Sequence, residues 1–378
     1  MTKSIRNPQL RIDQILPTFC QHDAIGNEVR WLRKLLFQMN IDNRVYAERG
    51  DIQKSTGVYP IEDYPQHQHN RFATIHHFST GSNVPHWLLY GTTRIITRNH
   101  NITPPAFFHA SSDHTAYNLC HQGYRQRDLV DRLTHNYWHD SEFNIELFKN
   151  SSKHHHVLPI LRHYKHLTEL HSDQNLIQKL QTGHIKNILF VGRFAPNKKT
   201  HDLILALKAL HNFVNKDIRL ILVGSPHTLY GQQTLQIAKE LDLKISDLNQ
   251  EHLGDIVIPG QVNDETLASI YHACDLFLCM SEHEGFCVPL LEALTFNIPV
   301  MAHSCTAIPG TLKDGGILFN KQHPEIYIPQ IKNALYDRKV RDNLKAQAQK
   351  RAQDFSWGSL QTLFQSKIEQ IFEDTQYS

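Results

Sequence analysis

Two carboxylates beside a loop that leads into a helix are the strongest chemical signal in the sequence. Glu284 and Glu292 lie eight residues apart within SEHEGFCVPLLEALTFNIPV (281–300). Pro289 suits the first turn of a helix, where no amide hydrogen is required. Free amides at a helix N-terminus bind anions, and a carboxylate aimed at the same place accepts hydrogen bonds from hydroxyl groups. The pattern predicts a site for phosphate and sugar hydroxyls; a capped surface helix with incidental acids is the alternative.

Two cations form a second signal in FVGRFAPNKKTHDLI (190–204). Arg193 follows Gly192 at the end of an apolar run, and Lys198 or Lys199 lies five or six residues further on. Two cations at the carboxyl end of a strand can clamp a diphosphate. A basic loop that only neutralises the neighbouring helix region is the alternative.

The elements that must position these residues alternate along the second half of the chain. Short apolar runs end in or near glycine or a polar loop, and amphipathic patterns with helical spacing separate them. Such alternation predicts βαβ units and a parallel sheet covered on both faces. Ligands of such sheets bind beyond the carboxyl ends of the strands. The predicted strands are 187–192, 218–224, 255–260, 275–280 and 298–302, and the predicted helices are 201–214, 232–241, 264–274 and 289–296.

The first half is less regular but predicts a second Rossmann-like domain. Helix Asn27–Met39 carries its apolar residues on one face. Predicted strands are RIDQILPTF (11–19), NRVYAE (43–48), RFATIHHF (71–78) and TRIITRN (93–99). We therefore expect an N-terminal domain over 1–165, a C-terminal domain over 166–354, and a terminal amphipathic helix over 355–378 that packs back on the N-terminal domain.

Composition narrows the function classes. The 378 residues carry a net charge of +2, and the Lys and Arg residues are scattered, so no nucleic-acid partner is expected. No run is long and apolar enough to cross a bilayer, and MTKSIRNPQL lacks the apolar core of a signal peptide, which predicts a cytoplasmic protein. The mildly basic N-terminal half suits an acidic acceptor or peripheral contact with the inner face of a membrane; an ordinary solvated face is the alternative.

The spacing of the cysteines and histidines in the sequence does not predict a metal site. The six cysteines form no CxxC pair and are expected to be reduced core thiols. Most of the 27 histidines lie in polar stretches without metal-ligand spacing, and the run His154–His156 is not expected to bind metal. The chain also lacks a D-x-D motif. No metal or other cofactor is therefore expected.

The two motifs, in this order, resemble the family 4 glycosyltransferases, which have the GT-B fold of two Rossmann-like domains facing a cleft. The resemblance covers residues 187–320 and rests on GR-x4-K combined with E-x7-E. In the first half, HDAIGNEVRWLRKLL, NHNITPPAFF, DSEFNIELF and VLPI resemble segments of bacterial members acting on polysaccharides or lipopolysaccharides. The resemblance implies a retaining transferase that moves a sugar from a nucleoside diphosphate to a glycan, lipid-linked or other hydroxyl acceptor.

The resemblance also implies roles for single residues on the donor side. Arg193 and Lys198 match the cations that bind the diphosphate, and they would stabilise the charge of the leaving group. Glu284 matches the acid that approaches the donor sugar, and Glu292 matches the acid that holds the ribose hydroxyls. Whether Glu284 acts as a nucleophile or stabilises a front-face displacement stays open. Residues that would help seat the sugar and phosphate are Gly285, Phe286 and Cys287.

On the acceptor side the resemblance is weaker. Gly26 matches a glycine at a helix start near the phosphates and the acceptor, although the usual glycine motif is reduced to this residue. His100 matches a catalytic-site histidine that lines the cleft, with a hydrogen-bonded packing histidine as the alternative. Two further departures concern loop shape: Lys199 replaces a glycine, and Gly310 stands where many members have an acid.

Three other functions make different predictions about the sequence or the products. An NAD-dependent dehydrogenase would need G-x-G-x-x-G after a strand, and the sequence has none. A nucleotide-sugar epimerase of similar architecture would convert the donor without an acceptor. A non-catalytic nucleotide-sugar-binding protein would not be expected to keep both cations and both acids.

Overall fold

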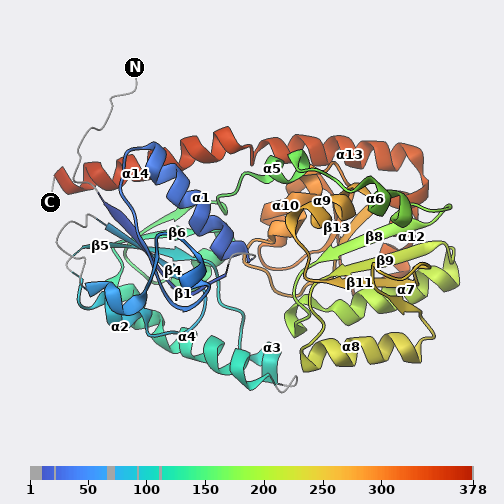
Figure 1. Cartoon of the computed structure of the whole chain (residues 1–378), viewed down its shortest axis with the longest axis horizontal. Helices are drawn as coiled ribbons and strands as arrows, with labels where there is room; N and C mark the ends of the chain where they lie inside the picture. The colour runs from blue at the N-terminus through green and yellow to red at the C-terminus, as the bar shows by residue number, and fades with distance from the viewer. Residues whose placement is uncertain (1–10, 21–22, 66–72, 92, 110–112, 377–378) are drawn as a thin grey trace. The chain divides into compact units, whose positions relative to one another are not determined.

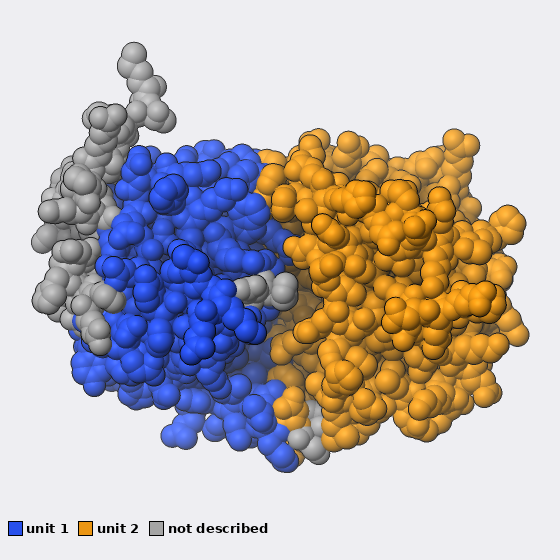
Figure 2. All heavy atoms as spheres, in the orientation of Figure 1, with its two compact units in different colours: residues 1–106, 114–162, 357–378 blue, residues 107–113, 163–356 orange. Residues whose placement is uncertain are grey.

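The computed structural model describes residues 11–20, 23–65, 73–91, 93–109 and 113–376. The chain divides into two compact units, shown separately coloured in Figure 2. Unit 1 comprises residues 1–106, 114–162 and 357–378, and unit 2 comprises 107–113 and 163–356. The N-terminal segment used to argue against a signal peptide lies outside the described residues, as do Arg71 and Phe72 of the predicted third strand.

Unit 1 is built on a parallel sheet in the order β3-β2-β1-β4-β5-β6-β7 (Figure 1). The strands expected near 11–19, 43–48, 71–78 and 93–99 are all found, as β1, β2, β4 and β5. β4 is buried along its whole length, as expected for a sheet covered on both faces. The bounds are β1 Ile12–Phe19, β2 Val45–Gly50, β3 Val58–Pro60, β4 Ala73–Phe78, β5 Arg94–Asn99, β6 Asn136–His139 and β7 His154–Val157.

Helix α1 shows why the helices of unit 1 form where they do. It begins at Ala24, earlier than the apolar pattern predicted, because Asp23 accepts a hydrogen bond from the Gly26 amide at 2.5 Å and caps the helix. Val29 and Leu32 lie on its buried face. The helices of unit 1 are α1 Ala24–Gln38, α2 Val84–Leu88, α3 Ala106–His109, which crosses into unit 2, α4 His114–Leu133 and α14 Trp357–Gln376, with 3₁₀ helices at Ile52–Lys54, Ile61–Asp63 and Glu142–Phe148.

The terminal helix α14 contacts residues of the first half of the chain. The Trp357 ring lies 4.9 Å from the Trp31 ring, and the buried Phe364 ring lies 6.0 Å from that of Trp138. Arg94 donates a hydrogen bond to the Ile371 carbonyl at 3.2 Å. These contacts explain why residues 357–378 group with unit 1 although the whole of unit 2 precedes them.

Unit 2 contains a parallel sheet in the order β10-β11-β9-β8-β12-β13-β14. The alternation of strands and helices expected from 187 to 302 is confirmed. The strands are β8 Lys186–Val191, β9 Ile218–Val223, β10 Ile245–Ser246, β11 Ile256–Gly260, β12 Leu276–Cys279, β13 Val300–His303 and β14 Ile317–Phe319. The helices are α5 Tyr164–Glu169, α6 Gln174–Leu180, α7 Thr200–Phe213, α8 Leu229–Glu240, α9 Asp264–His272, α10 Val288–Thr295, α11 Ile308–Leu312, α12 Pro324–Tyr336 and α13 Arg338–Gln353, with 3₁₀ helices at Pro196–Lys198 and Lys313–Gly315.

The strand order of unit 2 places the two motifs side by side. β8 lies between β9 and β12, so the chain order of the strands reverses at β8. One motif follows β8 and the other follows β12, and these strands pair in parallel with Leu276 opposite Ile188. Their carboxyl ends therefore meet at one edge, where ligands of such sheets bind. Within the described residues, no helix is long and apolar enough to cross a membrane.

Candidate active site

Hydrogen bonds tie the loop after β8 to the loop after β12. The Asn197 side chain donates to the His283 carbonyl at 3.1 Å, and the Glu282 amide donates to the Asn197 carbonyl at 2.8 Å. Asn197 is buried although it is polar, which is tolerable because these bonds satisfy it in part. The two sequence motifs thus form one structural site in unit 2.

Lys198 and Glu284 form an ion pair at the centre of this site. The lysine Nζ lies 2.7 Å from Glu284 Oε1 and 2.6 Å from Oε2. The Glu284 side chain is only 7% exposed and that of Lys198 20%. Burial alone would lower the pKa of Lys198, but the Glu284 carboxylate outweighs burial and the pKa is raised. Lys198 therefore carries its charge and is paired with Glu284, the predicted catalytic acid.

The backbone of Glu284 is held by a residue that sequence reasoning missed. Thr306 Oγ1 accepts from the Glu284 amide and donates to the Glu284 carbonyl, each at 2.9 Å. Thr306 follows β13 and has a left-handed backbone, with φ at 44°. The rule that polar residues after strands line the site would have drawn attention to HSCT (303–306), the polar stretch after the last predicted strand.

Glu292 is buried one turn into α10 and has its own partner. Tyr271 Oη, from α9, donates to Glu292 Oε2 at 2.8 Å. Cys287 precedes α10 in the left-handed region, with φ at 73°, and Pro289 occupies the first turn as expected. Asn297 has φ at 57° just after the helix end, the left-handed position at which helices commonly end. Sequence reasoning missed Tyr271, which lies in another element.

The remaining donor-side candidates occupy distinct surroundings. Arg193 is exposed directly after β8. Phe286 is buried and packs edge-on against Phe355, with ring centroids 6.0 Å apart. Gly285 has intermediate exposure. Gly310 lies in α11, and a Cβ at this position would meet nothing within 4 Å. Steric crowding therefore does not explain why glycine stands where many members of the family have an acid.

Lys199 belongs to a different group of charges from Lys198. Its Nζ lies 3.1 Å from Glu282 Oε2, and Lys321 also pairs with Glu282. Burial opposes ionisation of Glu282, but the two lysines outweigh it and lower its pKa. Lys199 has φ at 51°, the left-handed region in which glycine costs least. The departure from glycine noted in the sequence therefore falls at a backbone position that favours glycine.

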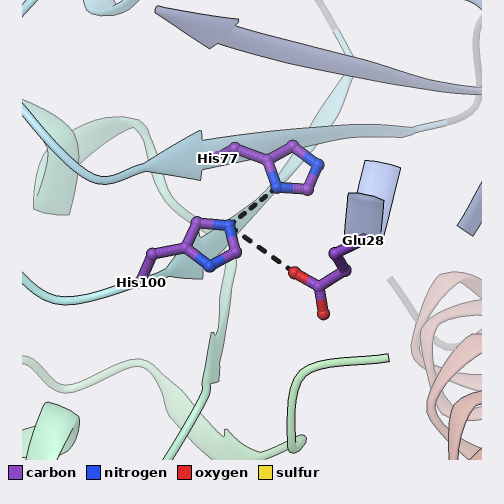
Figure 3. Close-up of side chains that lie close together, drawn as sticks. All are labelled: Glu28, His77 and His100. Atoms are coloured by element: carbon purple, nitrogen blue, oxygen red, sulfur yellow. Dashed lines mark hydrogen bonds and ion pairs between the residues drawn. The ribbon is translucent and has the colours of Figure 1, made fainter. Parts of the chain in front are cut away.

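In unit 1, Gly26 and His100 are brought to the edge formed by β1, β4 and β5, but neither is placed relative to unit 2. A Cβ at Gly26 would lie 1.7 Å from the Cys20 carbonyl oxygen, so only glycine fits this helix start. His100 directly follows β5 and stacks on His77 of β4, with Glu28 of α1 beside them (Figure 3).

The partners of His100 determine where its protons lie. Gln14 donates its amide to the Val29 carbonyl, so its Oε1 must accept from His77 Nε2, at 3.0 Å. Burial and the charges of His100 and Arg98 hold the pKa of His77 well below its ordinary value, so His77 is neutral and its Nδ1 accepts. His100 Nε2 must then donate to His77 Nδ1, at 2.8 Å.

The other ring nitrogen of His100 also faces an acceptor. Its Nδ1 lies 3.1 Å from the Asp140 carboxylate, so both ring nitrogens of His100 are engaged. Arg98 Nη2 lies 2.7 Å from Glu28 and 2.8 Å from Asp140. Glu28 and Asp140 thus flank the buried Arg98 guanidinium, and His100 adjoins the same two carboxylates. The His100 side chain is 3% exposed, and its nitrogens are engaged, so this arrangement favours a packing role over direct contact with a substrate.

Comparison with known proteins agrees with this geometry. Residues 172–351 match the family model described as Glycosyl transferases group 1. This segment is therefore similar to group 1 glycosyl transferases. It contains both cations and both carboxylates of the site.

Relatives that match about half of the chain are named as glycosyltransferases. The O-antigen chain mannosyltransferase B of Escherichia coli is 27% identical over 187 residues, 50% of this chain and 46% of the relative. The D-inositol 3-phosphate glycosyltransferase of Corynebacterium efficiens is 25% identical over 190 residues, 48% of this chain and 42% of the relative. The chain thus spans less than half the length of these curated relatives.

Solved structures confirm the GT-B fold. HepE from Anabaena in complex with UDP and glucose aligns with a TM-score of 0.70 at 17% identity, over 96% of this chain and 100% of that one. Sucrose-phosphate synthase from Thermosynechococcus elongatus aligns with a TM-score of 0.71 at 15% identity, over 97% of this chain and 100% of that one. The expected fold class, two Rossmann-like domains of the GT-B type, is therefore correct.

Proposed function

We propose that the protein is a retaining glycosyltransferase that moves a sugar from a nucleoside diphosphate to a hydroxyl of a glycan or lipid-linked acceptor. The observation that carries the proposal is the Lys198–Glu284 pair at the adjoining carboxyl ends of β8 and β12. The matching family segment and the mannosyltransferase relatives support it. The mildly basic N-terminal half supports a location at the inner face of a membrane, where lipid-linked acceptors would be met.

The ion pair suggests how the donor is received. A diphosphate arriving beside Lys198 offers the ammonium a second anion, which frees Glu284 to face the donor sugar. Arg193 is exposed after β8 and supplies the second cation. As the bond to the anomeric carbon breaks, Lys198 and Arg193 stabilise the negative leaving group, while Glu284 stabilises the positive charge that develops on the sugar.

A direct assay separates this proposal from the epimerase and binding-protein alternatives. The full chain is incubated with labelled UDP- and GDP-sugars and a panel of glycan and lipid-linked acceptors, and the products are separated. Label on an acceptor supports the proposal. Conversion of one nucleotide-sugar into another identifies an epimerase. Donor binding without any product, measured as thermal stabilisation of about 2.7 kcal/mol at 100 times Kd, identifies a binding protein.

The two acids are predicted to have separable effects on kinetics. Glu292→Gln should raise the donor KM more than it lowers kcat, because a contact with the ribose is present in both ground and transition states. Glu284→Gln should lower kcat more than it raises KM. Calorimetry with the free nucleoside diphosphate supplies the check, because this ligand has the ribose but no sugar. If Glu284→Gln weakened it as much as Glu292→Gln, the two carboxylates would form one nucleotide-binding unit.

Activity is predicted to survive EDTA. Two side-chain cations and the N-terminus of α10 are available to stabilise the diphosphate, so a divalent ion is not needed for that charge. The measurement is the initial rate before and after chelation and gel filtration. A rate that vanished and returned with Mg²⁺ or Mn²⁺ would overturn this assignment of charge stabilisation.

A further inference from the structure

Two buried cysteines converge on Glu284 from different elements. Cys279 ends β12 and is fully buried, and Cys287 immediately precedes α10 and is 8% exposed. One ligand atom from each of Cys279, Cys287 and Glu284 lies within 4.8 Å of the other two. Sequence reasoning treated these cysteines as separate core thiols, because no short CxxC spacing announces the cluster.

The spacing suits a single metal ion. In a tetrahedral zinc site with Zn–S bonds of about 2.3 Å, neighbouring sulfurs lie about 3.8 Å apart. Three atoms within 4.8 Å of one another can reach that spacing through small side-chain rotations. Two thiolates and one carboxylate are also a ligand set that prefers soft or borderline cations over Mg²⁺ or Ca²⁺.

The surrounding charges favour a divalent ion. Two thiolates and the Glu284 carboxylate bring three negative charges, which a divalent cation and the neighbouring Lys198 ammonium balance. By contrast, in the Glu28–His77–His100 group, the other candidate cluster in the described part of the chain, the Glu28 carboxylate is already paired with the Arg98 guanidinium.

We propose that Cys279, Cys287 and Glu284 form a binding site for a thiophilic divalent cation such as Zn²⁺ or Cd²⁺. The ion would take the Glu284 carboxylate away from Lys198. On the proposed function, it would therefore inhibit sugar transfer, since Glu284 would no longer face the donor sugar. The site is thus inhibitory rather than catalytic, which is consistent with the prediction that activity survives EDTA.

The test uses the reduced, chelator-treated full chain and Cd²⁺ as the probe. Binding is measured by equilibrium dialysis, and the ultraviolet thiolate-to-cadmium absorption reports sulfur ligation. One Cd²⁺ per chain with this absorption is expected. Cys287→Ser should weaken binding at least about tenfold, and Cys279→Ser/Cys287→Ser should remove the absorption. Cys120→Ser, which alters a buried cysteine of unit 1, is the matched control and should bind like the unchanged chain.

Two results would overturn the site: no Cd²⁺ absorption with the unchanged chain, or equal absorption with the double variant. Circular dichroism and urea unfolding show whether each variant is folded. Glu284→Gln should weaken Cd²⁺ binding while both thiols remain, which tests the carboxylate without altering the cysteines. Because binding is measured without turnover, Cd²⁺ binding in a chain that transfers no sugar would support the site and contradict the proposed function.

Discussion

Replacing Lys198 with Ala is expected to lower kcat/KM for sugar transfer at least about 100-fold. The ammonium is largely buried and paired with Glu284, so its charge acts where water screens it little. Loss of such a contact to a leaving group removes transition-state stabilisation of this size. The measurement is steady-state kinetics with the preferred nucleotide-sugar.

Lys199→Gly is the matched control for Lys198→Ala. Lys199 is the neighbouring lysine, but it pairs with Glu282, and its left-handed backbone accepts glycine without strain. Its replacement should change kcat/KM much less. Equal losses at both positions would mean that the loop after β8 is assigned in the wrong register.

A second control separates lost chemistry from lost folding. Lys198→Ala leaves the Glu284 carboxylate buried without its lysine, which is expected to cost stability. Lys198→Met combined with Glu284→Gln removes both charges and should recover most of that stability. Activity should stay low in this double variant. Recovery of activity together with stability would show that Lys198 has only a structural role.

Acidification is expected to destabilise unit 1 strongly. Burial lowers the pKa of His76 and of His139 to about 3, and that of His77 well below its ordinary value. These histidines are neutral in the folded state, whereas the unfolded chain protonates them below about pH 6.5. The neutral histidines therefore make their full contribution to the free energy of unfolding above that pH. This contribution is lost as the pH falls toward 3. The three together lose about 4 kcal/mol per pH unit once the unfolded chain is protonated.

Tryptophan fluorescence can follow this transition selectively. All four tryptophans of the chain, at positions 31, 87, 138 and 357, belong to unit 1. Urea unfolding at pH 7 and pH 5 should show a much lower free energy of unfolding at pH 5. His76→Leu should reduce the pH dependence by about 1.4 kcal/mol per unit, because neither ring nitrogen of His76 has a hydrogen-bond partner among the described residues. If His76→Leu left the pH dependence of the unfolding free energy unchanged, the lowered pKa assigned to His76 would be wrong.

Periodicity predicted the strands well because β-strands in these sheets are continuous apolar runs. β8, β9, β12 and β13 were all expected where they lie. The expectation that ligands bind beyond the carboxyl ends of such strands indicated the edge at which the two motifs meet. Boundaries were less accurate where capping decides them: Asp23 starts α1 three residues before the predicted Asn27. Local side-chain hydrogen bonds of this kind do not appear in apolar spacing.

The partners of the site residues were harder to predict than the residues themselves. Motif spacing indicated Lys198 and Glu284, but not that they pair with each other. Tyr271 and Thr306 are ordinary polar residues in other elements, and only the packing of α9 and the segment after β13 brings them to the acids. The cluster around His100 likewise joins residues between 14 and 140, whose contacts no local pattern records.

The late position of α14 bears on how the chain folds during synthesis. Residues 163–356 leave the ribosome as an unbroken stretch that includes nearly all of unit 2, so this unit can fold before the chain is finished. Unit 1 cannot complete its fold before α14 is synthesised, because side chains of α14 pack against Trp31 and Trp138. During translation the earlier half therefore exposes apolar surface for longest, and a nascent chain stalled before residue 357 would be a natural client for chaperones.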